Sequence, residues 1–230
     1  MKPSYLISFV LFILFLSSCG HSPRNKNYDN NAIDSCVVYK PISMHITKCH
    51  NRKPKYIVIH YTAGRSSKSG KAESLYDVFV SKNASTDFAV DDKNIVQFNP
   101  DLDNYYCWAV GDSKKNSSSG ASFYRKATNK NTINIEICSN LKLGTSSDVA
   151  NHSGWTFSKA SLDNAVKITK IIMKKYDIPI ENVIRHYDIS GKVCPGVIGW
   201  NDEVIYNKGE QTKEKSKSDK WQEFKKRLVD

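Results

Sequence analysis

Residues 56–61, Tyr-Ile-Val-Ile-His-Tyr, constrain the fold of this chain more than any other segment. The run is almost uniformly apolar and rich in β-branched residues, as in a strand that is buried on both faces. Such a strand lies inside a sheet that helices cover on both sides. The run therefore predicts an α/β protein with a central strand that brings His60 to its end.

The other predicted strands are shorter. Residues 87–90 and 95–98 form two strands joined by the hairpin turn Asp-Asp-Lys-Asn. Residues 132–138 alternate polar and apolar side chains, which predicts a strand with one buried face. Residues 182–185 form a last short strand that delivers His186 at its end.

Three helices are predicted from apolar residues that recur every three or four positions. The clearest covers residues 158–176, with Ser158 as its N-cap and Pro179 preventing its continuation. A helix over residues 73–81 places Leu75, Val78 and Phe79 on one side. The terminal helix has an apolar stripe of Trp221, Phe224 and Leu228.

Strands interleaved with helices predict a single α/β domain, a mixed central β-sheet flanked by helices on both faces. We assign residues 53–230 to this domain, with a charged, exposed insertion at about 208–218. Residues 19–52 are mostly polar and are interpreted as a tether followed by a lead-in segment.

Residues 1–18 have the features of a signal peptide, with Lys2 before an apolar run that is too short to span a membrane. The sequence Leu-Ser-Ser-Cys at its end resembles a bacterial lipobox, in which Cys19 is acylated and becomes the first mature residue. The alternative is an ordinary secretory signal in which Cys19 is incidental. The lipobox predicts a lipoprotein of the cell envelope that faces the periplasm or cell wall.

The formal charge is +11, and removal of Lys2 with the signal lowers it to +10. A basic protein outside the cytoplasm is attracted to anionic polymers such as peptidoglycan. The lysines are scattered, which is typical of a solvated surface, and the predicted location also argues against a nucleic-acid partner.

Two histidines end apolar strands, His60 after "YIVI" and His186 after "VIR", and Cys194 follows one loop later. Ligand sites of α/β sheets assemble at strand ends. Two imidazoles and a thiolate are three zinc ligands that leave a fourth position open, as in catalytic sites. Taken singly, each histidine is more simply a hydrogen-bonded core residue and Cys194 half of a disulfide; their conjunction favours metal.

Three segments together resemble the zinc-dependent N-acetylmuramoyl-L-alanine amidases of the type-2 family, which includes the peptidoglycan recognition proteins. They are "IVIHYTA" at 57–63, "INIEICSN" at 133–140 and "RHYDISGKVCPG" at 185–196, and the similarity spans roughly residues 53–200. The resemblance implies hydrolysis, by a zinc-bound water, of the amide between N-acetylmuramic acid and L-alanine in peptidoglycan or muropeptides.

Carried over by position, the resemblance makes His60, His186 and Cys194 the ligands of Zn2+. It makes Glu136 the general acid and base and Lys192 the cation that stabilises the oxyanion. Otherwise Glu136 is a strand carboxylate that faces solvent or a lysine, and Lys192 a surface lysine.

Two positions depart from the family. Thr86 stands where other members carry a catalytic tyrosine, so Glu136 has to carry the proton transfers. The family's Trp-His-Ala-Gly segment is here Trp108-Ala-Val-Gly, without the histidine, which leaves Trp108 as a substrate-binding wall of the cleft.

Two further functions stay open. One is a wall-binding module that recognises muropeptides without cutting them, and the other is a wall-degrading antibacterial effector with the same chemistry. Cys36, Cys49, Cys107 and Cys138 allow three disulfide connectivities, of which Cys36–Cys49 would staple the lead-in segment.

Overall fold

The computed structural model describes residues 33–63, 71–111, 120–142, 154–202, 204–206, 213–215 and 217–230. The predicted signal peptide and Cys19 lie outside the described residues, as do most residues of the predicted insertion. Within the described part of the chain, none of the helices is both long and apolar enough to cross a membrane.

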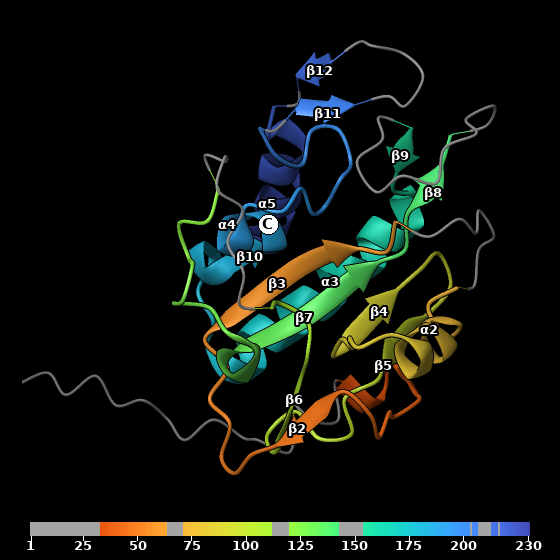
Figure 1. Cartoon of the computed structure of the whole chain (residues 1–230), viewed down its shortest axis with the longest axis vertical. Helices are drawn as coiled ribbons and strands as arrows, with labels where there is room; N and C mark the ends of the chain where they lie inside the picture. The colour runs from red at the N-terminus through yellow and green to blue at the C-terminus, as the bar shows by residue number, and fades with distance from the viewer. Residues whose placement is uncertain are drawn as a thin grey trace, which may run out of the picture.

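The centre of the fold is a six-stranded mixed sheet with the strand order β1-β5-β4-β7-β3-β10 (Figure 1). β4 and β5 are antiparallel, and every other neighbouring pair is parallel. The strands are β1 (Val38–Tyr39), β3 (Tyr56–Tyr61), β4 (Phe88–Val90), β5 (Ile95–Gln97), β7 (Thr132–Ile137) and β10 (Val183–Arg185).

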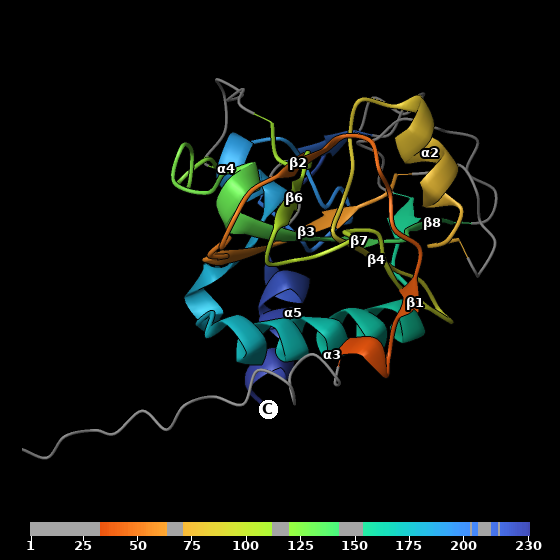
Figure 2. The same cartoon turned by 90° about the horizontal axis from the view of Figure 1, so that it is seen from below.

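The predicted mixed sheet with helices on both faces is confirmed (Figure 2). The helices α3 (Lys159–Tyr176) and α5 (Asp219–Val229) cover one face. The helices α2 (Leu75–Ser81) and α4 (His186–Ser190) lie on the other, together with the pair formed by β2 (Ile46–Lys48) and β6 (Tyr105–Cys107).

Small elements complete the described chain. They are the strand pair β8 (Asn140–Leu141) and β9 (Trp155–Thr156), the pair β11 (Val204–Tyr206) and β12 (Lys213–Lys215), and the 3-10 turns η1 (Asn129–Asn131) and η2 (Ile180–Asn182). β12 falls in the stretch predicted as a charged insertion and pairs with β11.

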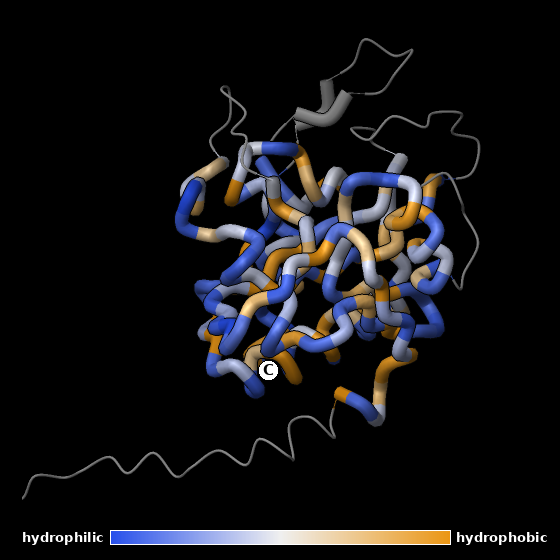
Figure 3. The backbone as a smooth tube through the Cα atoms, turned by 60° about the horizontal axis from the view of Figure 1, so that its bottom comes forward, coloured by the Kyte–Doolittle hydropathy of each residue, from blue (hydrophilic) through white to orange (hydrophobic). Residues whose placement is uncertain are grey.

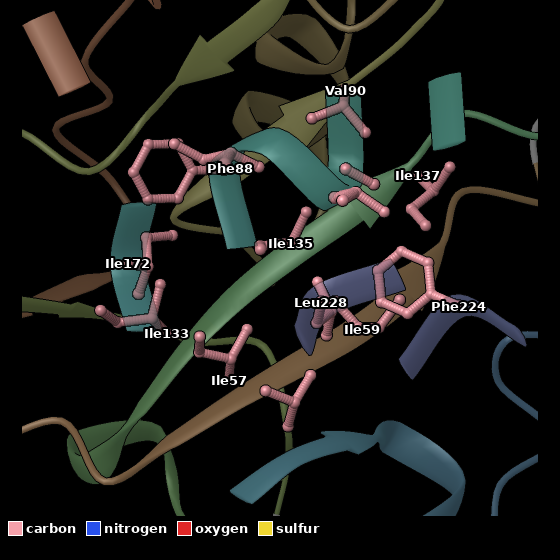
Figure 4. Close-up of a cluster of buried hydrophobic side chains, with 14 of the residues drawn as sticks. Ile57, Ile59, Phe88, Val90, Ile133, Ile135, Ile137, Ile172, Phe224 and Leu228 are labelled. Carbon is pink, nitrogen blue, oxygen red and sulfur yellow. The ribbon is translucent and has the colours of Figure 1, made fainter. Parts of the chain in front are cut away.

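The core lies between the sheet and the helices α3 and α5 (Figure 4). Alternate residues of β3 and β7 point into it, and both strands are buried along most of their length. Burying one such isoleucine stabilises the fold by about 1.5–3 kcal/mol. The core residues labelled in Figure 4 are Ile57, Ile59, Phe88, Val90, Ile133, Ile135, Ile137, Ile172, Phe224 and Leu228.

Both long helices form where the sequence predicts them. Ser158 caps α3 by accepting a hydrogen bond from the backbone N–H of Ser161, and α5 buries Trp221, Phe224 and Leu228. Hydrophobic stretches alternate with hydrophilic connections along the backbone (Figure 3).

Two sequence predictions need correction. β7 is buried on both faces, not one, because α3 packs on the face of its isoleucines and β6 packs over the face of its polar residues. On the short helix α2, Phe79 is buried but the Val78 side of the helix is exposed, with Val78 44% accessible.

From residue 33 on, the lead-in segment is part of the folded domain. β1 extends the central sheet beside β5, β2 pairs with β6, and Ile33 and Ile42 are buried. The described cysteines, Cys36, Cys49, Cys107, Cys138 and Cys194, are all free thiols, so the Cys36–Cys49 staple is not formed in this structure.

Candidate metal centre

Three neighbouring parallel strands bring the candidate residues to one edge of the sheet. β7, β3 and β10 are adjacent and run in the same direction. His60 of β3 is directly opposite Glu136 of β7. Because Arg185 of β10 pairs with Ile59, the next residue, His186, emerges beside His60.

A tight turn then returns Cys194 to the same place. Gly191 ends α4 in the left-handed conformation, with φ of 73°, which glycine adopts without steric cost. The backbone N–H of Tyr187 donates to the carbonyl of Cys194 at 2.9 Å, which closes the loop. Asp188 holds the start of α4 through an ion pair of 2.6 Å with Arg185.

The structure brings all three predicted ligands together. One donor atom from each of His60, His186 and Cys194 lies within 4.8 Å of the others, and all three residues are buried. The thiol sulfur of Cys194 lies 3.8 Å from Nδ1 of His60, and the two imidazole rings have centroids 4.8 Å apart.

The electrostatics of these donors suit a cation. Burial lowers the pKa of His60 to about 4 and holds the pKa of His186 well below its usual range, so both rings are neutral and have a free lone pair. Burial raises the pKa of Cys194 to about 12, so a thiolate here needs a positive charge beside it. A divalent metal ion would supply that charge.

Glu136 lies beside the three donors. Its Oε1 is 4.0 Å from Nδ1 of His60, and the side chain is 21% exposed. Its Oε2 is buried without a hydrogen-bond partner among the described residues. Burial raises the pKa of Glu136 to about 8, and the nearby Lys192 ammonium opposes the rise. A carboxylate held near a metal site with a free oxygen can exchange a proton with a reacting molecule.

Lys192 and Trp108 line the same cavity, which has a volume of about 650 Å³ and includes His186 in its wall. The indole N–H of Trp108 donates to Oγ1 of Thr47 at 2.9 Å, and its ring packs on His45 with centroids 5.6 Å apart. Trp108 is 39% exposed, so its ring is oriented by these contacts but remains accessible from the cavity.

Thr86 occupies a different environment. It is 1% exposed, and its hydroxyl donates to the backbone carbonyls of Phe88 and Asn134. This side chain is part of the buried structure.

Sequence reasoning missed the side chains that support His60. Nε2 of His60 is hydrogen-bonded to Oδ1 of Asn134 at 3.1 Å, and Asn134 contacts Asp87. The available signal was that Asn134 and Glu136 are two residues apart on one strand and therefore share a face.

The family model described as N-acetylmuramoyl-L-alanine amidase matches residues 50–197. The N-acetylmuramoyl-L-alanine amidase CwlA of Bacillus subtilis (strain 168) is 32% identical over 149 residues, which cover 64% of this chain and 46% of CwlA. The N-acetylmuramoyl-L-alanine amidase CwlH of the same organism is 32% identical over 146 residues, covering 62% and 47%. The chain thus spans about half the length of these relatives.

Solved structures share the fold. A mutant endolysin from Bacillus subtilis has a TM-score of 0.51 at 26% identity, with 84% of this chain and 97% of that chain covered. A mutant of PlyL has a TM-score of 0.51 at 27% identity, with 80% and 90% covered. Because the family model covers well over half of the sequence, this chain belongs to the N-acetylmuramoyl-L-alanine amidase family.

Proposed function

We propose that the protein hydrolyses the amide bond between N-acetylmuramic acid and L-alanine in peptidoglycan or its muropeptide fragments. The observation that carries the proposal is the cluster of His60, His186 and Cys194 with Glu136 beside it. The names of the amidase relatives and the family match support the same activity.

Zn2+ is the cofactor that best fits this donor set. His60, His186 and Cys194 would hold it, since nitrogen and sulfur ligands suit zinc and three protein ligands leave one position for water or substrate. When bound, zinc makes a water molecule more acidic and polarises the carbonyl under attack.

Glu136 carries the proton in the proposed reaction. Its carboxylate takes a proton from the attacking water, whose oxygen forms a bond with the lactyl carbonyl carbon. As the carbon–nitrogen bond breaks, Glu136 returns that proton to the leaving amine of L-alanine. The unpartnered Oε2 supports this role, because no hydrogen bond within the described structure occupies it.

Lys192 stabilises the negative oxygen that develops on the carbonyl. The residue lines the same cavity as His186, which supports a place for its ammonium near the reacting bond. Its positive charge acts on Glu136, His60 and His186, which supports its position at the centre of the site. A positive charge aimed at a developing oxyanion lowers the barrier without reorganisation.

Trp108 is proposed to bind substrate through the exposed face of its ring. Replacing Trp108 by alanine is expected to raise KM for muropeptides with little change in kcat, because the ring lines the cavity but is neither one of the three donors nor the proposed proton carrier. Steady-state kinetics on a soluble muropeptide measure both values. A fall in kcat with unchanged KM would contradict this role.

A binding module that does not cut is the alternative to an enzyme. The two are distinguished by incubating the protein with a soluble N-acetylmuramoyl peptide, with and without zinc, and separating the products by chromatography. The proposal expects free peptide in the zinc-loaded sample and intact substrate after chelation. Intact substrate in both samples, together with sedimentation of the protein on sacculi, would favour the binding module.

We further propose that the protein acts outside the cytoplasm, attached to a membrane through acylated Cys19. The lipobox-like end of the signal segment supports this anchor, and an anchored enzyme fits turnover of the cell's own wall better than attack on neighbouring cells.

The anchor predicts a mass for the native protein. Mass spectrometry of protein purified from membranes is expected to find acyl chains on Cys19 as the first residue, and Cys19→Ala is expected to leave the protein unacylated. Native protein with an unmodified cysteine, released in soluble form, would favour a secreted effector instead.

A further inference from the structure

We propose that Asn134 is a positioning residue that, together with Asp87 and Arg52, fixes the tautomer of His60 and leaves its Nδ1 free for metal. The proposal rests on the zinc site proposed above. A continuous line of buried hydrogen bonds runs from Arg52 through Asp87 and Asn134 to the imidazole of His60.

The line begins in the lead-in segment. Arg52 lies just before β3 and is 5% exposed. Its Nη1 donates to Oδ1 of Asp87 at 3.1 Å, and both side chains in this ion pair are fully buried. The guanidinium also donates to four backbone carbonyls, those of Leu102, Tyr105, Lys130 and Thr132. Arg52 is thus held in one orientation, and an arginine is always a donor.

Asp87 links Arg52 to Asn134 as a hydrogen-bond acceptor. Besides the bond from Arg52, its Oδ1 accepts a bond from Nδ2 of Asn99 at 2.6 Å. Its Oδ2 accepts bonds from the backbone N–H of Asn134 at 2.8 Å and from Nδ2 of Asn134 at 3.1 Å. Both carboxylate oxygens therefore face N–H donors, and Asp87 acts only as an acceptor.

This acceptor determines how the Asn134 amide is turned. Only the NH2 end of an amide can donate, so Nδ2 has to face Asp87 and Oδ1 has to face the other way. The other way is His60, whose Nε2 lies 3.1 Å from Oδ1. Reversing the amide would place two acceptors, the amide oxygen and the carboxylate, against each other.

An amide oxygen can only accept, so Nε2 of His60 has to carry the proton. In a neutral imidazole the other nitrogen, Nδ1, then has a free lone pair. Nδ1 is the atom 3.8 Å from the thiol of Cys194 and 4.0 Å from Glu136, so the lone pair points into the metal centre. Partners that fix a metal-binding histidine in this way are worth about 10–100-fold in metal affinity.

The sheet register explains how one strand serves two purposes. Asn134 and Glu136 are two residues apart on β7 and lie on the same face, opposite the isoleucines that enter the core. β7 lies between β3, which carries His60, and β4, which begins one residue after Asp87 (Figure 1). The same strand thus places both the positioning residue and the proposed acid and base.

The test compares three variants in the metal-free and zinc-loaded protein. Asn134→Leu removes the acceptor for His60 in a side chain of similar size. Thr86→Val is the matched control, because it removes a buried hydroxyl that bonds to the backbone carbonyls of Phe88 and Asn134 and keeps the side chains of Asn134, Asp87 and His60. Asn134→Asp keeps one oxygen toward His60 but places its other oxygen against the Asp87 carboxylate. This variant is therefore expected to lower stability while preserving the acceptor for His60.

The first readout is the His60 tautomer, from nitrogen NMR of histidine-labelled metal-free protein at neutral pH, with the His60 signal assigned from its loss in His60→Gln. Wild type, Thr86→Val and Asn134→Asp are expected to carry the proton on Nε2, and Asn134→Leu is expected to populate the Nδ1-protonated form. The second readout is zinc affinity by competition with a coloured chelator, expected to fall about 10–100-fold in Asn134→Leu alone.

The tautomer is read without metal or substrate, so its result is independent of whether the protein is an amidase. Failure of wild type to bind zinc would count against the proposed function and leave the tautomer result standing. The positioning role is overturned if Asn134→Leu keeps the Nε2 proton and the affinity of wild type. It is also overturned if Thr86→Val loses the Nε2 proton of His60 and zinc affinity to the same extent as Asn134→Leu, since that pattern reports general loosening of the fold.

Discussion

Replacing Glu136 by glutamine is expected to remove most of the turnover while leaving zinc content and thermal stability close to wild type. Glutamine has nearly the same size and shape but cannot accept the proton of the attacking water. General acid and base groups contribute about 10²–10⁴-fold to such reactions, and kcat is expected to fall in that range. The measurement is kcat on a soluble muropeptide, with zinc content determined on the same sample.

The matched control for this change is Glu181→Gln. Glu181 is an exposed carboxylate in the turn before β10, at the opposite end of that strand from His186. The same chemical change there is expected to leave kcat as it is. Undiminished turnover in Glu136→Gln would place the base on another residue.

Replacing His186 by alanine is expected to abolish stoichiometric zinc binding, and with it both hydrolysis and the stabilisation that added zinc gives to wild type. The reason is the small number of ligands: two remaining donors and an open cavity wall hold zinc far more weakly than three converging donors. Ligand binding to the folded state raises its stability, so zinc-dependent thermal unfolding reports the site without substrate.

His50→Ala is the control for this second change, because His50 is exposed in the loop before β3 and lies outside the donor cluster. It is expected to bind zinc as wild type does. Stoichiometric zinc in His186→Ala would contradict the ligand set.

The part of the site that follows strand ends could be predicted from sequence. An apolar strand ending in histidine is a local pattern, and two such strands placed side by side in a parallel sheet bring their ends to one edge. His60 and His186 therefore came together as expected, with Cys194 one loop later. Glu136 was carried over from the family resemblance, and the structure places it opposite His60 on the neighbouring strand.

The line of hydrogen bonds from Arg52 to His60, which supports the site, leaves no local pattern in the sequence. Arg52 and Asp87 are separated by 35 positions and Asp87 and Asn134 by 47, so their contacts exist only after the sheet has formed. Arg52 is a single charge in a polar segment that composition assigns to a lead-in. Its burial follows from the backbone carbonyls that surround it, which no sequence period reveals.

The two fold predictions that needed correction, the exposed Val78 and the buried polar face of β7, also depend on contacts that form only in the folded structure. Periodicity tells which residues share a face, but not whether another layer covers that face. On β7 the second face is covered because β6 packs over it. On α2 the Val78 side of the helix stays open.

The most direct test of the central claim is mass spectrometry of purified sacculi after incubation with zinc-loaded protein that lacks residues 1–19. We expect new free amino termini on L-alanine, and none when a chelator is present. If sacculi gain no new L-alanine termini although the protein binds one zinc and sediments with the wall, that result would contradict cleavage of this bond in intact peptidoglycan.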